Sequence, residues 1–441
     1  MILLDFFKRD KLARFSRAVR EEGLRGALAR TRQYVSARLA GRGITSVIRR
    51  RESPGHRLPS EHLAAVWLDL AERDGFHISQ PPAILSRRRK VAMIGDLNLP
   101  QCRKYRVEQL DEIWRLADVD YSFSHYEDVA RSTAILQDAT HVMFYRLCTT
   151  PVTSMLSYEA RRLRLPILYD LDDPLFSVSA YGTYENMKAL PTWQKKHFMN
   201  EAPKYLDVMN SADMLSVSTP GMKAHAELYS TRPVHVRRNF ADSQALQAGA
   251  RAMKSQPAVG NEGFRVAFAS GSQGHEIDFN LIVDDVTAFL AGGADRKLVI
   301  LGHFNLKLLP EGLRGQVETH PFSDYETYLE TLASVDCAVM PLTDDIFNRC
   351  KSAVRVIDAA SVGVPSIVGS VSDMAEVVDD GQTGHVIPKG ASWAESLKKM
   401  ATDQTRTKEM GRQARQLLES RWSARLDAPV VDPEIIRWVQ E

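Results

Sequence analysis

The chain has 441 residues, of which 44% are hydrophobic and 25% are charged. This length exceeds one ordinary core, and this composition excludes a disordered or fibrous protein. The four cysteines are scattered without a Cys-x-x-Cys pair, which predicts reduced thiols in a cytosolic protein. The opening MILLDFF is too short for a secretory signal, and no stretch approaches about 18 apolar residues. We therefore expect a cytoplasmic protein.

The beginning of the chain is strongly basic. Residues 1–51 hold 14 Lys or Arg against four acids, a local charge of +10, so the rest carries −8 within the total of +2. Apolar residues recur at helical spacing within residues 11–39, which predicts one or two basic amphipathic helices. Such helices either pack on the protein itself or attach it peripherally to the anionic inner face of a membrane. Nucleic acid is not expected as a partner, because interleaved aromatics are missing. Residues 1–89 are thus interpreted as a basic helical extension.

From residue 90 the pattern changes to short β-branched runs separated by helical stretches. Within residues 90–242 these runs are VAMIG, HVMFY, PILYDLDD, DMLSVST and PVHVRRN. Such alternation is typical of a parallel sheet covered by helices on both faces. Residues 243–262 lack strand character and contain Pro257 and Gly260, which indicates a linker.

The alternation then begins again in residues 263–425, with FRVAFAS, KLVILG, DCAVMP, PSIVGS and GHVIP. We therefore predict an α/β protein with two doubly wound, Rossmann-like domains in tandem. Residues 426–441 form a tail or helix that packs back on the first domain in this prediction. Ligands of open α/β sheets bind beyond the carboxyl ends of the strands, so a site is expected in the cleft between the domains.

The stretch NRCKSAVRVIDAASVGVP, residues 348–365, predicts a buried helix of about three turns. Ser352 is the expected N-cap, and Gly363 is the expected stop before a proline. Most residues between them are apolar or small, so we expect the helix to pack against the sheet.

Three charged side chains interrupt this apolar helix. Lys351, Arg355 and Asp358 fall at i, i+4 and i+7 and therefore share one stripe. Burying two unpaired cations would be costly, and an anion between them resolves the conflict. We expect Lys351, Ser352 and Arg355 to hold a diphosphate, and Asp358 to accept hydrogen bonds from ribose hydroxyls. The alternative is an internal Arg355–Asp358 salt bridge with Lys351 in solvent.

A glycine-containing turn indicates the same ligand. The run GSQGHEIDFN follows the strand FRVAFAS, and Gly271 and Gly274 permit close approach of the backbone. A small-residue turn between strand and helix suits a phosphate. Ser270, Gly271, Ser272 and His275 are thus predicted to contact the donor, with His275 adding a hydrogen bond or positive charge.

Polar residues also follow two strands of the first domain. Tyr105 and Arg106 come after the first strand and are expected to line the cleft and contact the acceptor or sugar. Asp170, Asp172 and Asp173 follow another strand, and three carboxylates so close in the sequence suggest a metal site. A single carboxylate that contacts sugar hydroxyls or acts as a base needs no metal. We therefore predict no metal, with Asp172 catalytic and Asp170 and Asp173 in contact with sugar; helix capping by Asp173 is the alternative.

Two segments resemble a known family. The stretch DAASVGVPSIVGSVSDMAEVVDDGQTGHVI, residues 358–387, resembles the nucleotide-binding segment of family 4 GT-B glycosyltransferases. In that family an acid opens an Ala-rich run, followed by Gly-x-Pro, a strand, another acid and a D-G-x-x-G turn. The end of the first domain, SADMLSVSTPGMKAHAEL and then VHVRRNFAD, is similar to the same family. The resemblance covers roughly residues 90–420.

The resemblance implies a GT-B fold and a retaining hexosyltransferase without a cofactor, using a nucleotide diphosphate sugar and a carbohydrate or lipid-linked acceptor in polysaccharide or glycoconjugate synthesis. Asp358 matches the second Glu of the E-x7-E motif, which binds ribose. Lys351 and Arg355 fall beside the diphosphate, where they would stabilise the leaving group as catalytic residues. Cys350 stands where the motif has its first Glu, and Asp172 where many relatives have a sugar-contacting His. These departures motivate an alternative, a catalytically silent nucleotide-sugar scaffold or sensor.

Overall fold

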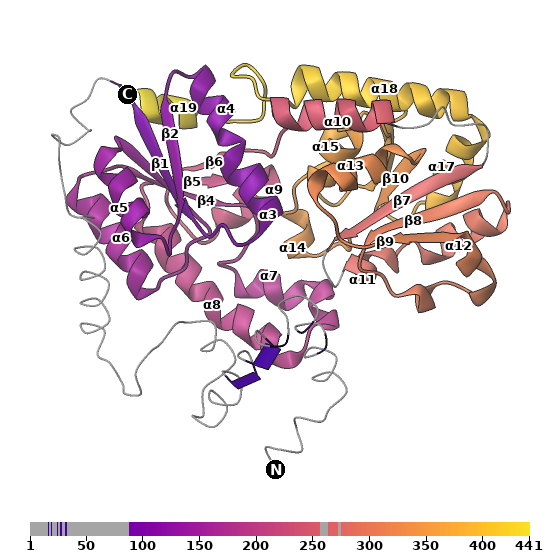
Figure 1. Ribbon diagram of the computed structural model, residues 1–441, viewed down its shortest axis with the longest axis horizontal. Helices are drawn as coiled ribbons and strands as arrows, with labels where there is room; N and C mark the ends of the chain where they lie inside the picture. Colours follow the sequence, from indigo (N-terminus) through magenta and orange to yellow (C-terminus); the bar gives the residue numbers. More distant parts are fainter. Residues whose placement is uncertain are drawn as a thin grey trace, which may run out of the picture. The chain divides into compact units, whose positions relative to one another are not determined.

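The computed structural model describes residues 88–255, 263–271 and 275–441, with seven single positions between Ser16 and Arg32. The chain divides into two compact units, residues 1–61 and 62–441, and the second contains both predicted domains. The basic extension lies almost wholly outside the described residues and stays a prediction. The α/β architecture is confirmed, because the second unit contains two six-stranded parallel sheets flanked by helices (Figure 1).

The first sheet has the strand order β2-β1-β3-β4-β5-β6. Its strands are β1 (Lys90–Gly95), β2 (Asp120–His125), β3 (His141–Tyr145), β4 (Ile167–Leu171), β5 (Met214–Val217) and β6 (Val234–Val236). Val91 and Met93 pack with helix α4 (Leu110–Leu116), whereas Ala92 and Ile94 face the opposite cluster. Both faces are therefore apolar, as expected for a sheet that helices cover on both sides.

Further helices surround this sheet, and most of them belong to the cluster on the side of Ala92 and Ile94. They are α3 (Pro100–Arg103), the π-helix η4 (Lys104–Glu108), α5 (Val129–Asp138), α6 (Pro151–Arg162), α7 (Val178–Thr183), the 3-10 helix η5 (Glu185–Ala189), α8 (Thr192–Ser211) and α9 (Pro220–Ala226). Helices α3 and η4 come next after β1 in the chain, beyond the carboxyl end of that strand, and η4 carries Tyr105 toward the second domain.

The second sheet has the order β12-β11-β10-β7-β8-β9. Its strands are β7 (Phe264–Gly271), β8 (Arg296–Gly302), β9 (Val317–His320), β10 (Cys337–Met340), β11 (Ser366–Gly369) and β12 (Gly384–Ile387). Val266 and Phe268 pack toward helices on one face, and Ala267 packs on the other. The alternation again buries both faces of a parallel sheet.

Each face of the second sheet has its own set of helices (Figure 1). One set comprises α10 (Ser243–Ser255), α13 (Tyr325–Ala333), α15 (Val354–Ser361) and α18 (Gln404–Arg421). The other comprises α11 (His275–Phe279), α12 (Val283–Ala291) and α17 (Trp393–Thr402). Short elements complete the domain: η6 (Leu306–Leu308), η7 (Glu311–Gln316), α14 (Ile346–Arg349) and α16 (Met374–Val377).

Strands β2 and β9 are absent from the predicted runs. Each lies at the edge of its sheet, next to β1 and β8 respectively. The sequences DYSFSH and VETH are mostly polar and only partly buried. An edge strand contacts one neighbour and can face water, so it need not carry the apolar run by which buried strands are recognised.

Two segments join the domains outside the sheets. Most of the predicted linker forms helix α10, which packs against α13 and α15 of the second domain. Helix α19 (Pro433–Gln440) lies on the first domain, where the Trp438 ring contacts His141 at 4.7 Å between centroids and Asp432 pairs with His235 at 2.9 Å. In the described part of the chain, no helix combines the length and apolarity needed to cross a membrane.

Candidate functional site

Helix α15 forms at the predicted position but is shorter, with Val354 as its first residue and Ser361 as its last. Gly363 adopts a φ of 69°, in the left-handed region, and so ends the helix as predicted. The prediction that Ser352 caps the helix is wrong. Ala353 is the N-cap residue, and the Ser352 hydroxyl instead accepts a hydrogen bond from Asn239 of the first domain at 2.9 Å. A contact between domains, which local sequence cannot reveal, takes the place of the cap.

The two cations of the predicted stripe have different partners. The Lys351 ammonium lies 3.7 Å from Asp173 of the first domain and faces the rings of Phe347 and Tyr184. Arg355 donates to the Ala269 carbonyl oxygen at 3.4 Å, and it forms no ion pair with any described residue. The alternative of an Arg355–Asp358 salt bridge with Lys351 in solvent is therefore wrong.

The electrostatics of this pair favour an anion. Burial opposes the charge of Lys351, but Asp173, Tyr184 and Asp278 outweigh it and raise the pKa of the ammonium. Burial lowers the pKa of Arg355, and Asp278 only partly compensates. A half-buried guanidinium that forms no ion pair with any described residue is a candidate to bind an anionic ligand.

In the predicted phosphate turn, His275 at the carboxyl end is the residue that the structure places beside the candidate site. Gly271 is the last residue of strand β7. Residues 272–274 lie outside the described residues, so the prediction that Ser272 contacts the donor stays a prediction. The prediction that the Ser270 side chain contacts the donor is wrong. This side chain is buried, and its hydroxyl donates a hydrogen bond to the His303 carbonyl oxygen. His275 opens helix α11, and its Nδ1 lies 3.2 Å from Asp278.

Asp358 joins the two domains. Its carboxylate, only 4% exposed, accepts hydrogen bonds from Tyr105 of η4 and, at 2.9 Å, from Tyr325 of α13. Lys104 lies above the ring of Tyr325. Tyr105 and Asp358, which the sequence assigns to acceptor and ribose respectively, thus bind one another in this structure. Burial raises the pKa of Asp358 to about 6, although Lys104 and the tyrosine hydroxyls act in the opposite direction.

This raised pKa predicts a stability that falls with pH. The folded state holds the Asp358 proton more tightly than the unfolded chain, whose carboxyl has the ordinary pKa of 3.8. The contribution is therefore complete below pH 3.8 and is lost as pH rises through about 6, which amounts to about 3 kcal/mol. We expect Asp358→Asn to unfold at higher urea concentration than the parent at pH 8, with little difference at pH 4.5. Parallel stability curves for the two proteins would contradict this.

The predictions that Arg106 and Asp170 of the first domain contact sugar are wrong, because both side chains are buried. Arg106 and Asp170 are both fully buried, and the Arg106 Nε donates to Asp170 at 3.1 Å. Arg237, also fully buried, donates to the same carboxylate. The three groups form an internal ion cluster, so Arg106 and Asp170 hold the fold together instead of contacting sugar.

Asp172 and Asp173 follow the carboxyl end of β4. Asp172 pairs with Arg146 at 3.1 Å and accepts a hydrogen bond from the Tyr145 hydroxyl at 2.9 Å. Burial opposes the Asp172 charge, but Arg146, Arg106 and Tyr145 outweigh it, so its pKa is lowered. Each of the three acids thus faces a cation, and within the described residues no group of three His, Cys, Asp or Glu is placed to hold a metal.

The loop before Lys351 is held tightly against the first domain. The Cys350 carbonyl oxygen accepts a hydrogen bond from Thr219 at 3.0 Å, and the Cys350 side chain is buried. A Cβ added at Gly221 would overlap the Arg349 carbonyl oxygen. The absence of a side chain at Gly221 therefore lets α9 approach the loop that carries Lys351.

We expect Gly221→Ala to lower the melting temperature by several degrees and to reduce catalytic efficiency, because backbone atoms of the 349–351 loop must move. The matched control is Gly182→Ala in helix α7, where an added Cβ meets no atom within 4 Å. Differential scanning calorimetry and turnover assays of both variants check this. Equal behaviour of the two alanine variants would show that the close approach is unimportant.

Sequence analysis missed Asp278, Asn186 and Tyr325. Asp278 receives a hydrogen bond from Asn186 of the first domain at 2.7 Å, and Tyr325 binds Asp358. Asp278 lies in DFNLIVDDVTAFL, where it looks like one polar residue of an amphipathic helix; that segment in fact divides into α11 and α12. No local pattern marks these residues, because their partners come from distant parts of the chain.

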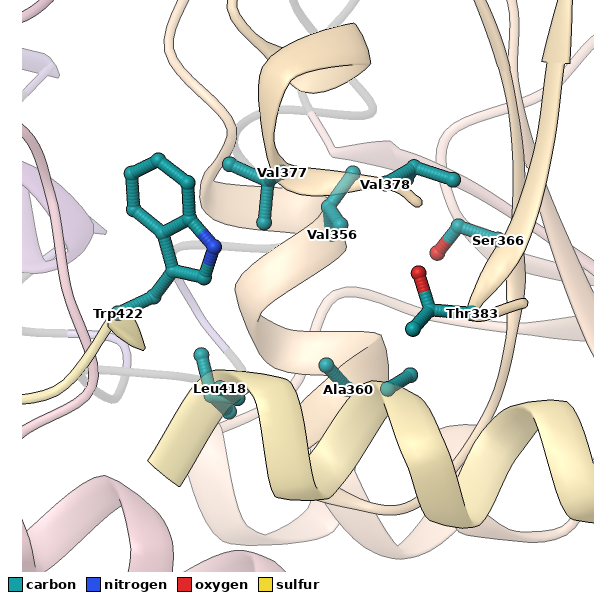
Figure 2. Close-up of a pocket in the computed structure, with 9 residues that line it drawn as sticks. Val356, Ala360, Ser366, Val377, Val378, Thr383, Leu418 and Trp422 are labelled. Carbon is teal, nitrogen blue, oxygen red and sulfur yellow. The ribbon is translucent and has the colours of Figure 1, made fainter. Parts of the chain in front are cut away.

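The enclosed cavity beside α15 is not the ligand site. Figure 2 shows side chains of α15, α18 and the neighbouring loops around a space of about 10 Å³, closed on one side by Trp422. This space accommodates at most one water molecule. A larger hollow of about 580 Å³ includes Lys90 and Asp120, at the amino ends of β1 and β2, and so lies away from the carboxyl ends of the strands.

Two Rossmann-like domains in tandem, with charged side chains between them, form the GT-B fold. Residues 265–403 match the model of a family described as Glycosyl transferases group 1. The second domain is therefore similar to the glycosyl transferases of group 1. This confirms the resemblance of residues 358–387.

One solved structure shares the fold, and a second is similar at a lower score. Sucrose-phosphate synthase from Thermosynechococcus elongatus is 14% identical, with a TM-score of 0.50 over 76% of this chain and 95% of that one. HepE from Anabaena, solved in complex with UDP, is 12% identical, with a TM-score of 0.49 over 76% and 96%. No curated protein matches the chain. At these identities the likeness concerns the fold alone.

Proposed function

We propose that this glycosyltransferase moves a hexosyl group from a nucleotide diphosphate sugar to a carbohydrate or lipid-linked acceptor, with retention of anomeric configuration. The observation that carries the proposal is Arg355, a half-buried guanidinium at the start of α15 that forms no ion pair with any described residue. Lys351 and His275 lie close enough to affect each other's charge. Their common ligand would be the diphosphate.

The proposed chemistry follows from this cluster. Breaking the glycosidic bond leaves negative charge on the diphosphate, and donors that already point at that position need no reorganisation as the charge develops. Lys351 and Arg355 supply two cations, and the first backbone N–H groups of α15 supply further donors. In this structure the Asp358 carboxylate accepts a hydrogen bond from the Tyr105 hydroxyl. Asp358 can therefore bind a ribose hydroxyl only after that hydroxyl replaces the one of Tyr105.

Turnover of a donor panel tests the proposal. Purified protein is incubated with UDP-, GDP- and dTDP-sugars and with oligosaccharide or polyprenyl-phosphate acceptors, and nucleotide release is measured. We expect one donor to be consumed, and NMR of the product to show the donor's anomeric configuration. Inversion would contradict the mechanism while leaving the donor site intact. Failure of every nucleotide sugar to raise the melting temperature would contradict the donor site.

A second candidate is a nucleotide-sugar-binding scaffold. It is favoured by Cys350, which is buried where relatives have the first Glu, and by Asp172, whose charge is already neutralised by Arg146. A scaffold would bind one donor in calorimetry without consuming it. The turnover assay therefore separates the two candidates directly.

The lipid-linked acceptor accords with the basic residues 1–51, for which we propose peripheral attachment to anionic membranes, at the inner face of the membrane. Co-sedimentation with phosphatidylglycerol vesicles should be lost on deletion of this segment and should weaken with salt. Unchanged co-sedimentation would remove this part of the proposal.

A further inference from the structure

Asp278 is a fully buried carboxylate to which the donor-site argument assigns no role. It accepts five hydrogen bonds, from Asn186 Nδ2 at 2.7 Å, Thr343 N at 2.9 Å, Thr343 Oγ1 at 3.0 Å, Asn348 Nδ2 at 3.2 Å and His275 Nδ1 at 3.2 Å. Asn186 comes from η5 of the first domain, and the other donors belong to the second. One carboxylate therefore connects a histidine of the donor site to the opposite domain.

This carboxylate remains charged. Burial opposes the charge of Asp278, but the hydrogen bonds from His275, Asn186 and Thr343 outweigh burial and lower its pKa. An ionised carboxylate at one ring nitrogen determines which tautomer a histidine adopts and stabilises the imidazolium. Because Asp278 accepts at Nδ1, that nitrogen carries the proton.

The other ring nitrogen of His275 is left for a ligand. Among the described residues, Nε2 has no hydrogen-bond partner, and the side chain is 19% exposed. The charged groups that affect the ring are Asp278 on its own helix and Arg355 and Lys351 from the segment opposite. Burial, with these two cations, lowers the pKa of His275, and Asp278 only partly compensates. The ring is therefore neutral at pH 7 in the free protein.

We propose that Asp278 is a positioning residue of the donor site, which holds His275 so that Nε2 takes up a proton as the diphosphate binds, and that Asn186 ties this pair to the first domain. The inference rests on the proposed function, since it takes the nucleotide sugar as ligand. In the step, one proton moves from solvent to Nε2, which then donates to a phosphate oxygen. Asp278 stays ionised, and the diphosphate cancels the repulsion from Lys351 and Arg355.

Proton uptake makes affinity depend on pH in a fixed direction. The donor complex stabilises the protonated His275 ring. Donor binding therefore strengthens as pH falls toward the pKa of His275 in the ligand-free protein, which is lowered from 6.5. Calorimetry with UDP-glucose and GDP-mannose between pH 5.5 and 8.5 tests this, because their diphosphates do not titrate in that range. We expect the dissociation constant of the bound donor to fall about tenfold from pH 8 to pH 6. The heat should vary with buffer ionisation enthalpy.

Three variants isolate the contribution of each residue. His275→Gln should bind more weakly than the parent at pH 6 and lose the His275-dependent slope, while any contribution of Asp358 stays in both proteins. Asn186→Ala should keep the slope but bind a few-fold more weakly at every pH, because the binding-competent arrangement is less populated. Asp278→Asn should flatten the profile. His197→Gln, exposed on α8, is the control and should match the parent.

The outcomes separate this inference from the donor site. A parent that binds UDP-glucose or GDP-mannose with no pH slope, or a His275→Gln variant that keeps the full slope, overturns the role of His275 and Asp278. Parent-like affinity in Asn186→Ala overturns the link to the first domain. Absence of binding to both probes and to the wider donor panel overturns the donor site and this inference with it. If Asp278→Asn fails to fold, His275→Gln still decides.

Discussion

Replacing Arg355 with alanine is expected to lower kcat/KM by about 10²–10³-fold, the usual effect of removing one preorganised donor from developing negative charge. The guanidinium is half-buried beside the end of β7 and forms no ion pair with any described residue, so its removal leaves no unpaired carboxylate behind. The loss should therefore appear in turnover with little loss of stability. Steady-state kinetics and urea unfolding of the same variant measure the two effects.

Arg349 provides the control for this experiment. It lies six residues earlier, is exposed, and pairs with Asp344 at 2.8 Å on the outer surface. Arg349→Ala should keep the parent's kcat/KM, because exposed ion pairs contribute little. Adding Lys351→Ala to Arg355→Ala should deepen the defect. Parent-like turnover in that double variant would exclude diphosphate stabilisation by these two cations.

Asp170→Asn is expected to destabilise the protein by about 3–5 kcal/mol, because it leaves two buried guanidiniums, Arg106 and Arg237, without their counter-ion. All three side chains have no exposed surface, so water cannot replace the carboxylate. Urea unfolding at pH 7 measures the change.

The comparison for Asp170 is Asp138→Asn, which removes the carboxylate that pairs with Lys90 at 3.0 Å on the surface. This variant should lose less than about 1 kcal/mol. If the two variants unfold at the same urea concentration, the buried cluster contributes no more than an exposed pair. Arg106→Met in the Asp170→Asn background would then test whether an apolar replacement is tolerated.

The alternation of strands and helices could be predicted from the sequence because buried parallel strands need apolar residues on both faces, which leaves a visible run in each. Edge strands such as β2 and β9 have no such need, and both were missed. The α15 helix was predicted for a similar reason, since its apolar residues must meet the sheet. Its exact start was wrong, because Ser352 is held by Asn239 from another domain.

The roles of the charged residues depended on burial and partners. Arg106 and Asp170 were predicted to contact sugar, yet Arg106 lies in η4 and Asp170 within β4, and both are buried in an ion cluster with Arg237. Tyr105 was expected to contact the acceptor, and in the structure its hydroxyl lies against Asp358, 253 residues further along the chain. Sequence spacing places a residue near the end of a strand, but it does not determine the direction of the side chain.

By itself, the sequence determined two doubly wound domains, the likeness of the second domain to glycosyltransferases, and the cationic stripe of Lys351 and Arg355, because these features depend on periodicity and on residues close in the chain. Only the tertiary structure decided which charges are already neutralised, and it showed that Asn186 and His275 both form hydrogen bonds with Asp278. A hydrogen bond between residues 92 positions apart leaves no periodic trace, since its energy depends on where the two domains bring their side chains together.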